Sequence, residues 1–212
     1  MKYFLAALLL SSALFSCKNH PVNNEPPAGD SAAARTAGDS SSPATDTAAQ
    51  AFFPVSDFIG GQVKMVDSLQ LPLSKSVTVK GKTVLAPPIA DAEFKLLAAA
   101  FRQPDISDPA LKKFYKESSF ADQSIPSIVI SYTTTNPALE IQKIDVIISP
   151  DPVKSDRVRT IYMEKQRVAG DTIIRQKLYW KANHNCQVIT EKQVGKTLLP
   201  AEQVKVVWDP TE

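Results

Sequence analysis

Apolar residues between positions 58 and 69 recur every three or four positions, which is the period of a helix that buries one face. The stripe consists of Phe58, Ile59, Val63, Val66 and Leu69. Ser56 and Asp57 suit the N-terminus of this helix, and Pro72 lies beyond its end. Gly60 and Gly61 each cost up to about 1 kcal/mol relative to alanine, which favours a helix that begins after them.

Two more helices are indicated further along the chain. Asp91 is a candidate cap for a helix whose buried face consists of Phe94, Leu97, Ala98 and Phe101. Asp108 is placed to cap a shorter helix that has Pro109 at its first position, where the missing N–H group costs nothing. Both predicted helices lie before Ser124, after which the spacing of apolar residues changes.

Between the first two helices, Val77 and Val79 alternate with polar residues ahead of a Lys80-Gly81 turn. This pattern predicts a β-hairpin or one strand with a bulge. The adjacent Gly81-Lys82-Thr83 lacks the earlier glycine and the following helix of a phosphate-binding loop. We therefore interpret the segment as a turn with solvated lysines.

After Ser124 the apolar period changes to two. Extended segments follow at SIVISYTTT, IQKIDVIIS, DRVRTIYMEKQRV, TIIRQKLYWKA, CQVITEKQV and QVKVVWD. Short connections such as Asn136-Pro137 and Ala169-Gly170-Asp171 require antiparallel neighbours. The sequence therefore predicts an α+β fold with N-terminal helices on one face of an antiparallel meander of about six strands, either flat or curled around a pocket.

The N-terminus differs from the rest of the chain. Lys2 precedes an apolar run of about 14 residues, whereas a membrane-spanning helix needs roughly 20, so residues 1–16 are interpreted as an export signal. The run ends in Leu14, Phe15, Ser16 and Cys17, which resembles the lipobox of bacterial lipoproteins. An ordinary secretory signal cut near Ser16, or a short inner-membrane hairpin, is the alternative.

The resemblance implies a diacylglycerol on the Cys17 thiol, cleavage before Cys17, and attachment to the membrane through acyl chains such as palmitate. Several acyl chains hold a soluble domain at a membrane, whereas one short chain binds only marginally. Lys18, in place of aspartate after the cysteine, implies sorting to the outer membrane of the cell envelope. Exposure to the periplasm or to the cell surface stays open.

Residues 17–50 are rich in Ala, Ser, Thr, Pro, Asn, Gly and Asp and contain no aromatic residue. Such a segment cannot bury enough apolar surface to offset its ordering entropy, so we expect a disordered tether. Residues 51–212 have the usual size of one domain.

The charge balance does not favour nucleic acid as a partner. The chain has 24 basic and 22 acidic residues, a net charge of +2, which gives no reason to expect nucleic-acid binding. No cofactor-binding motif is present. The domain holds a single cysteine, so its stability must come from its core.

His184 and Cys186 are the two residues most suited to catalysis. They lie two positions apart and would share a face of a strand, as a nucleophilic pair or as two metal ligands. A catalytic zinc needs three protein ligands, and Asp151 and Asp156 do not have the spacing of a calcium loop, so we expect no metal site. The alternative interpretation is a hairpin end with Cys186 as a small buried residue.

Basic residues cluster in two consecutive predicted strands. Arg157, Arg159, Lys165 and Arg167 share one side of the first strand, and Arg175 and Lys177 share a side of the next, opposite Ile174, Leu178 and Trp180. A hairpin turn near Gly170 would place both rows on one face, as a docking surface for an anionic lipid, a glycan or an envelope protein. The alternative is an ordinary solvated sheet face, since acidic residues dilute the charge.

Two functions agree with these features. The favoured one is a membrane-anchored, noncatalytic envelope lipoprotein whose tethered sheet domain binds a partner or ligand. The alternative is an envelope hydrolase that uses His184 and Cys186.

The lipobox yields the first testable prediction. In cells grown with a labelled fatty acid the protein should become labelled, whereas Cys17→Ser should stay unlabelled and uncleaved because it lacks the acceptor thiol. Gel autoradiography measures both properties, and Cys186→Ser is the matched control. Persistent labelling of the Cys17 variant contradicts the assignment.

Overall fold

The computed structural model describes residues 51–122, 126–150 and 157–209. All of them belong to one compact unit. The export signal, the tether and Cys17 lie outside the described residues, as do Asp151 and Asp156. Within the described ranges, no helix is both long enough and apolar enough to cross a membrane.

The described residues form three helices and ten strands. The helices are α1 (Val55–Ser68), α2 (Asp91–Arg102) and α3 (Pro109–Lys112). The strands are β1 (Ser74–Val79), β2 (Lys82–Leu85), β3 (Lys116–Asp122), β4 (Ser127–Thr133), β5 (Ile141–Ser149), β6 (Arg157–Ala169), β7 (Thr172–Lys181), β8 (Asn185–Val194), β9 (Thr197–Leu198) and β10 (Glu202–Val207).

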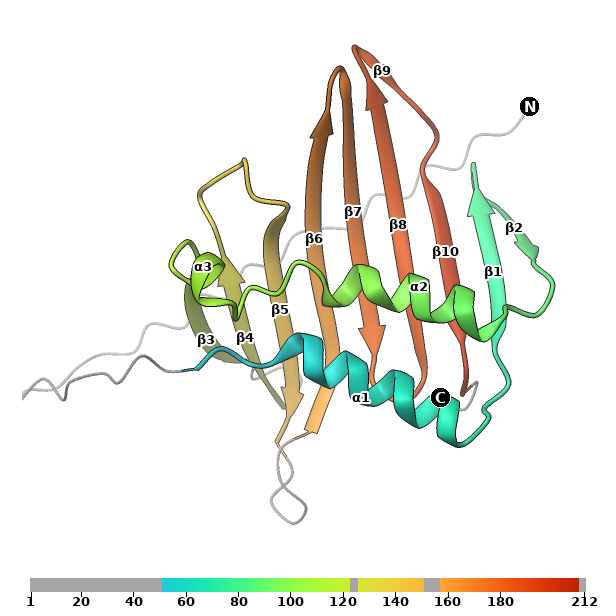
Figure 1. Ribbon diagram of the computed structural model, residues 1–212, viewed down its shortest axis with the longest axis horizontal. Coiled ribbons are helices and arrows are strands. Elements are labelled where there is room, and N and C mark those ends of the chain that lie inside the picture. The colour runs from blue at the N-terminus through green and yellow to red at the C-terminus, as the bar shows by residue number, and fades with distance from the viewer. Residues whose placement is uncertain (1–50, 123–125, 151–156, 210–212) are drawn as a thin grey trace, which may run out of the picture. The chain divides into compact units, whose positions relative to one another are not determined.

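All strands belong to one antiparallel sheet (Figure 1). Its order is β2-β1-β10-β8-β7-β6-β5-β4-β3, with β9 paired to β8. The predicted class of helices with an antiparallel sheet is confirmed, but about six strands is an underestimate. The β1–β2 hairpin joins the same sheet through β10. The edge strand β3 has the sequence KESSFAD, which lacks an apolar alternation.

Two of the predicted helix starts are wrong. Helix α1 begins at Val55 and includes Gly60 and Gly61. Its first turns are held by tertiary contacts: Val55 and Ser56 are buried, and Arg102 Nε donates to the Ser56 carbonyl at 3.2 Å. These contacts offset the low helix propensity of glycine.

Asp91 is the first residue of α2 and does not act as its side-chain cap. The predicted cap of α3 is confirmed, because the Asp108 carboxylate accepts from the Ala110 N–H at 2.8 Å. The predicted β-hairpin is also confirmed: Lys80 and Gly81 have φ values of 50° and 74°, as a tight two-residue hairpin turn requires.

Helices α1 and α2 cross the same side of the sheet, here named the helix-bearing face (Figure 1). Trp180 of β7 is fully buried between this face and α2. Phe101 packs edge-on against it with ring centroids 5.1 Å apart, and the Trp208 ring centroid also lies 5.1 Å from that of Trp180. Phe94 contacts Trp208 at 5.6 Å. These four rings are the aromatic cluster that joins α2 to the sheet.

The opposite side of the sheet, here named the open face, has no helix over it in the described part of the chain (Figure 1). Side chains alternate between the two faces along each strand. On β7, Leu178 and Trp180 are buried on the helix-bearing face, while Lys177 and Tyr179 are exposed on the open face. The expected inward direction of Trp180 is thereby confirmed.

The aromatic cluster yields a stability prediction. Phe101→Ala should lower the free energy of unfolding by about 3–5 kcal/mol, because it removes a buried ring that packs on Trp180. Leu96→Ala on the same helix is the matched control; its side chain is 76% exposed, so the change should be within about 0.5 kcal/mol. Urea unfolding followed by tryptophan fluorescence measures both, and equal losses would contradict the packing.

Candidate functional site

The structure does not bring the predicted basic residues together on one face. In the β6–β7 hairpin, odd-numbered residues of β6 pair with even-numbered residues of β7. Arg167 therefore lies opposite Ile174 on the helix-bearing face, whereas Arg175 lies opposite Gln166 on the open face. The expectation of one shared basic face is corrected by this register.

The basic row of β6 is itself divided. Lys165 lies on the helix-bearing face and is only 5% exposed, in line with the buried Ile161 and Met163. Arg157 and Arg159 are exposed near the start of β6, where a register shift interrupts its pairing with β5. These arginines and Lys165 thus have different surroundings.

The Lys165 side chain is held by contacts within the fold. Its Nζ donates to the Gln103 carbonyl just beyond α2 and lies 3.4 Å from Glu140 Oε1. Burial lowers the pKa of Lys165, and the Glu140 carboxylate partly counteracts that effect. The side chain connects the end of α2 to the sheet and is not available for docking.

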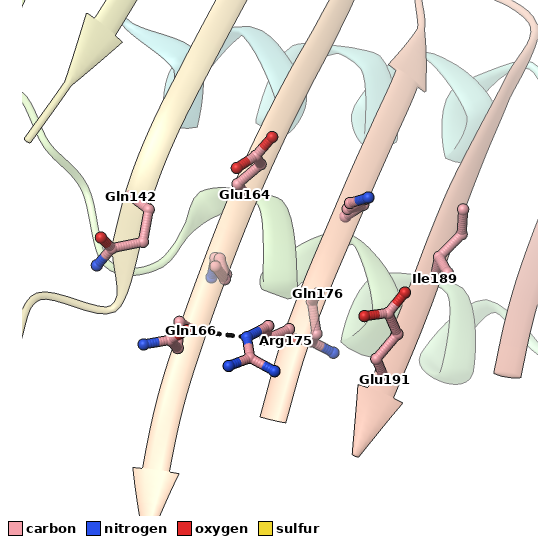
Figure 2. A pocket seen from close by; sticks show the side chains of 9 residues that line it. Gln142, Glu164, Gln166, Arg175, Gln176, Ile189 and Glu191 are labelled. Carbon is pink, nitrogen blue, oxygen red and sulfur yellow. Dashed lines mark hydrogen bonds between the residues drawn. The ribbon is translucent and has the colours of Figure 1, made fainter. Parts of the chain in front are cut away.

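Arg175 of β7 projects from the open face among polar and acidic neighbours (Figure 2). Lys177 is exposed on the same side of β7 and lines the same depression. Arg175 lies opposite Gln166 and Glu191, and its Nε donates to Gln166 Oε1 at 3.1 Å. Lys177 lies between Glu164 on β6 and Ile189 on β8. These side chains line a depression of about 210 Å³ in which basic and acidic groups alternate.

A tyrosine pair extends this surface toward the middle of the sheet. Tyr162 and Tyr179 face each other across β6 and β7 with ring centroids 4.7 Å apart. The Tyr162 hydroxyl donates to Glu164 Oε1 at 2.6 Å. Burial, and then the interaction with Glu164, raise the pKa of Tyr162.

We name this surface the open-face patch: Tyr162, Glu164, Gln166, Arg175, Lys177, Tyr179, Ile189 and Glu191. Sequence analysis found Arg175 and Lys177 of β7, since they alternate with buried apolar residues. It missed the members from β6 and β8, because their positions depend on the registers of two hairpins. The sequence did contain one signal for the β7–β8 register. Asn183 is a residue type that tolerates a positive φ, and in the turn between these strands it has a φ of 64°.

His184 and Cys186 occupy different environments. His184 lies in the turn before β8, with its side chain 28% exposed and its Nδ1 3.9 Å from Asp209 Oδ2. Cys186 is fully buried between Trp180 and Val206 on neighbouring strands. The alternation that would place both on one face does not apply, because His184 precedes the strand.

The Cys186 environment is unfavourable for a nucleophile. Burial raises the pKa of its thiol to about 12, whereas nucleophilic cysteines have depressed pKa values and solvent access. The interpretation of this segment as a hairpin end with a small buried cysteine agrees with the structure. Within the described ranges, no three His, Cys, Asp or Glu side chains are grouped as metal ligands.

Comparison with protein-family models, curated proteins and solved structures gives no match to this chain.

The burial of Cys186 yields a reactivity prediction. In a Cys17→Ser background, where Cys186 is the only thiol, iodoacetamide should label the folded protein about 100-fold or more slowly than the unfolded protein. The reason is that alkylation requires opening of the core. Mass spectrometry over time, with and without urea, measures both rates. Rapid native labelling contradicts the burial.

Proposed function

We propose that the protein is a noncatalytic envelope lipoprotein that is anchored through acyl chains on Cys17 and binds a partner protein through the open-face patch. The supporting observation is that, within the residues that the structure describes, no helix lies over the open face of the sheet, which presents tyrosines, charged groups and aliphatic residues together. Tyrosine and arginine are enriched in protein interfaces, and the rim of an interface is polar.

The patch continues into an aliphatic row near the β6–β7 turn. Val168, Ile173, Gln193 and Leu198 follow one another across β6, β7, β8 and β9. Val168 is 62% exposed and Leu198 is 65% exposed. Exposed apolar residues beside a polar, charged area favour a contact with another macromolecule.

The charges favour a partner protein over an anionic lipid or glycan. Glu164 and Glu191 lie beside Lys177 and Arg175, so the patch has both signs of charge and lacks the excess of positive charge that attracts polyanions. An arrangement of alternating charges selects a surface with the complementary arrangement. A protein surface can supply this complement.

The expected tether suits this role. A flexible segment of about 33 residues has a mean reach of roughly 30 Å, which lets a domain turn either face toward a partner beside the membrane. The buried thiol of Cys186 favours the noncatalytic proposal over a hydrolase that uses it with His184.

Charge reversal in the patch tests the proposal. Arg175→Glu with Lys177→Glu should reduce co-purification of envelope proteins with the full-length lipoprotein about tenfold or more, since each reversed charge faces a like charge on the partner. Quantitative mass spectrometry of detergent-solubilised envelopes measures the loss, and raising the salt concentration should weaken wild-type binding.

The control is Lys64→Glu with Lys196→Glu, which gives the same change in net charge at exposed positions outside the patch. It should retain the wild-type partners. Equal partner loss in both double variants, or in neither, would contradict docking through the patch.

A further inference from the structure

A cleft lies between α2 and the helix-bearing face. Strands β6 to β10 project beyond α2 toward the β6–β7 turn, so one flank of the helix faces uncovered sheet (Figure 1). That flank contributes Leu96, Leu97 and Ala100, while Val188 and Val204 contribute from the sheet. The cleft encloses about 300 Å³ and has a predominantly apolar lining. Its lining includes Leu96, which is 76% exposed.

A second depression with a different character lies beside the cleft, because Thr190 and Glu202, which line it, are two positions along β8 and β10 from Val188 and Val204. This shelf encloses about 510 Å³ and shares Gln176 with the cleft. Arg167, Ile174 and Lys192 lie in one row across β6, β7 and β8 on the shelf. The two cations therefore stand on either side of Ile174, two strand spacings or about 10 Å apart.

The two cations have no hydrogen bond or ion pair within the described part of the chain. Glu202 also lines the shelf. The two cations and this carboxylate together leave the shelf with one excess positive charge. The remaining charged groups at the cleft, Lys75 and Glu93, pair with each other. An anionic group on the shelf would therefore meet available positive charge beside the opening of an apolar cleft.

We infer that the cleft and shelf together bind a single-chain fatty acid, with its hydrocarbon chain against α2 and its carboxylate between Arg167 and Lys192. Small-molecule sites typically enclose about 300–1,000 Å³, with apolar walls and a few placed polar groups. Glu202 favours a singly charged carboxylate over a doubly charged phosphate, because it repels each negative charge. This site is on the opposite face from the open-face patch and is independent of the proposed function.

Photo-cross-linking tests this inference on the full-length lipidated protein in phosphatidylcholine vesicles. The probe is dodecanoic acid with a diazirine near its methyl end. After illumination and proteolysis, mass spectrometry should locate the cross-links in α2 and in the facing strands β8 and β10. Excess dodecanoate should compete, and dodecyltrimethylammonium should not, since it has the wrong charge.

The head group and chain length are tested by competition. Fatty acids of 8, 10 and 12 carbons should compete with an affinity that rises about fourfold per added CH₂ until the cleft is filled. A phosphate-headed lysolipid should compete less well than dodecanoate. Stronger competition by the lysolipid would overturn the assignment of a carboxylate.

Variants separate the two parts of the site. Ala100→Trp should fill the cleft and abolish cross-linking, with circular dichroism as the check on folding. Arg167→Gln and Lys192→Gln, both at exposed positions, should each weaken competition by dodecanoate about two- to fivefold. Arg175→Gln with Lys177→Gln on the open face is the matched control, and this double variant should leave competition by dodecanoate unchanged.

Three results would overturn the inference: cross-links spread over both faces, equal competition by the cationic amphiphile, or full labelling of a folded Ala100→Trp variant. If Ala100→Trp does not fold, Lys192→Glu decides the matter, because its exposed side chain can be reversed in charge without disturbing the core. Unchanged competition by dodecanoate in that variant would overturn the role of the shelf.

Discussion

The packing of Trp180 and Trp208 against Phe94 and Phe101 determines where α2 lies on the sheet. Among the described residues, no protein group accepts a hydrogen bond from the buried indole N–H of either tryptophan, and an unmet buried N–H costs roughly 1–3 kcal/mol. The area that these rings bury, and their edge-on and tilted contacts, offset that cost. Lys165 adds a polar connection at the end of α2, where its Nζ reaches the Gln103 carbonyl.

The sheet is larger than its helices can cover. Helices of 14 and 12 residues are about 21 and 18 Å long, whereas the nine strands of the main path span roughly 38 Å, and the 13 residues of β6 extend about 44 Å. The remaining area includes the open face and the part of the helix-bearing face beyond α2. No described helix lies over these regions, and both proposed binding surfaces lie in them.

The two surfaces have different chemistry because they occupy different sides of the same strands. On the open face, Arg175 and Lys177 alternate with Glu191 and Glu164 in a shallow depression that suits a complementary protein surface. Beyond α2, Arg167 and Lys192 stand beside an apolar cleft that suits an amphiphile. Strand register thus places Arg167 and Arg175 of one hairpin on different faces of the sheet.

Local periodicity predicted helices that include residues 62–68 and 94–101 and the alternating directions of the β7 side chains, and short connections predicted the antiparallel sheet, because these features depend on neighbours in the sequence. The sequence also placed Arg175 and Lys177 on the solvated side of β7. Only the tertiary structure decided the insertion of β10 between β1 and β8, the start of α1 at Val55, the burial of Lys165 and the separation of Arg167 from Arg175. These features depend on strand register and on contacts between distant segments, which the local sequence pattern does not encode.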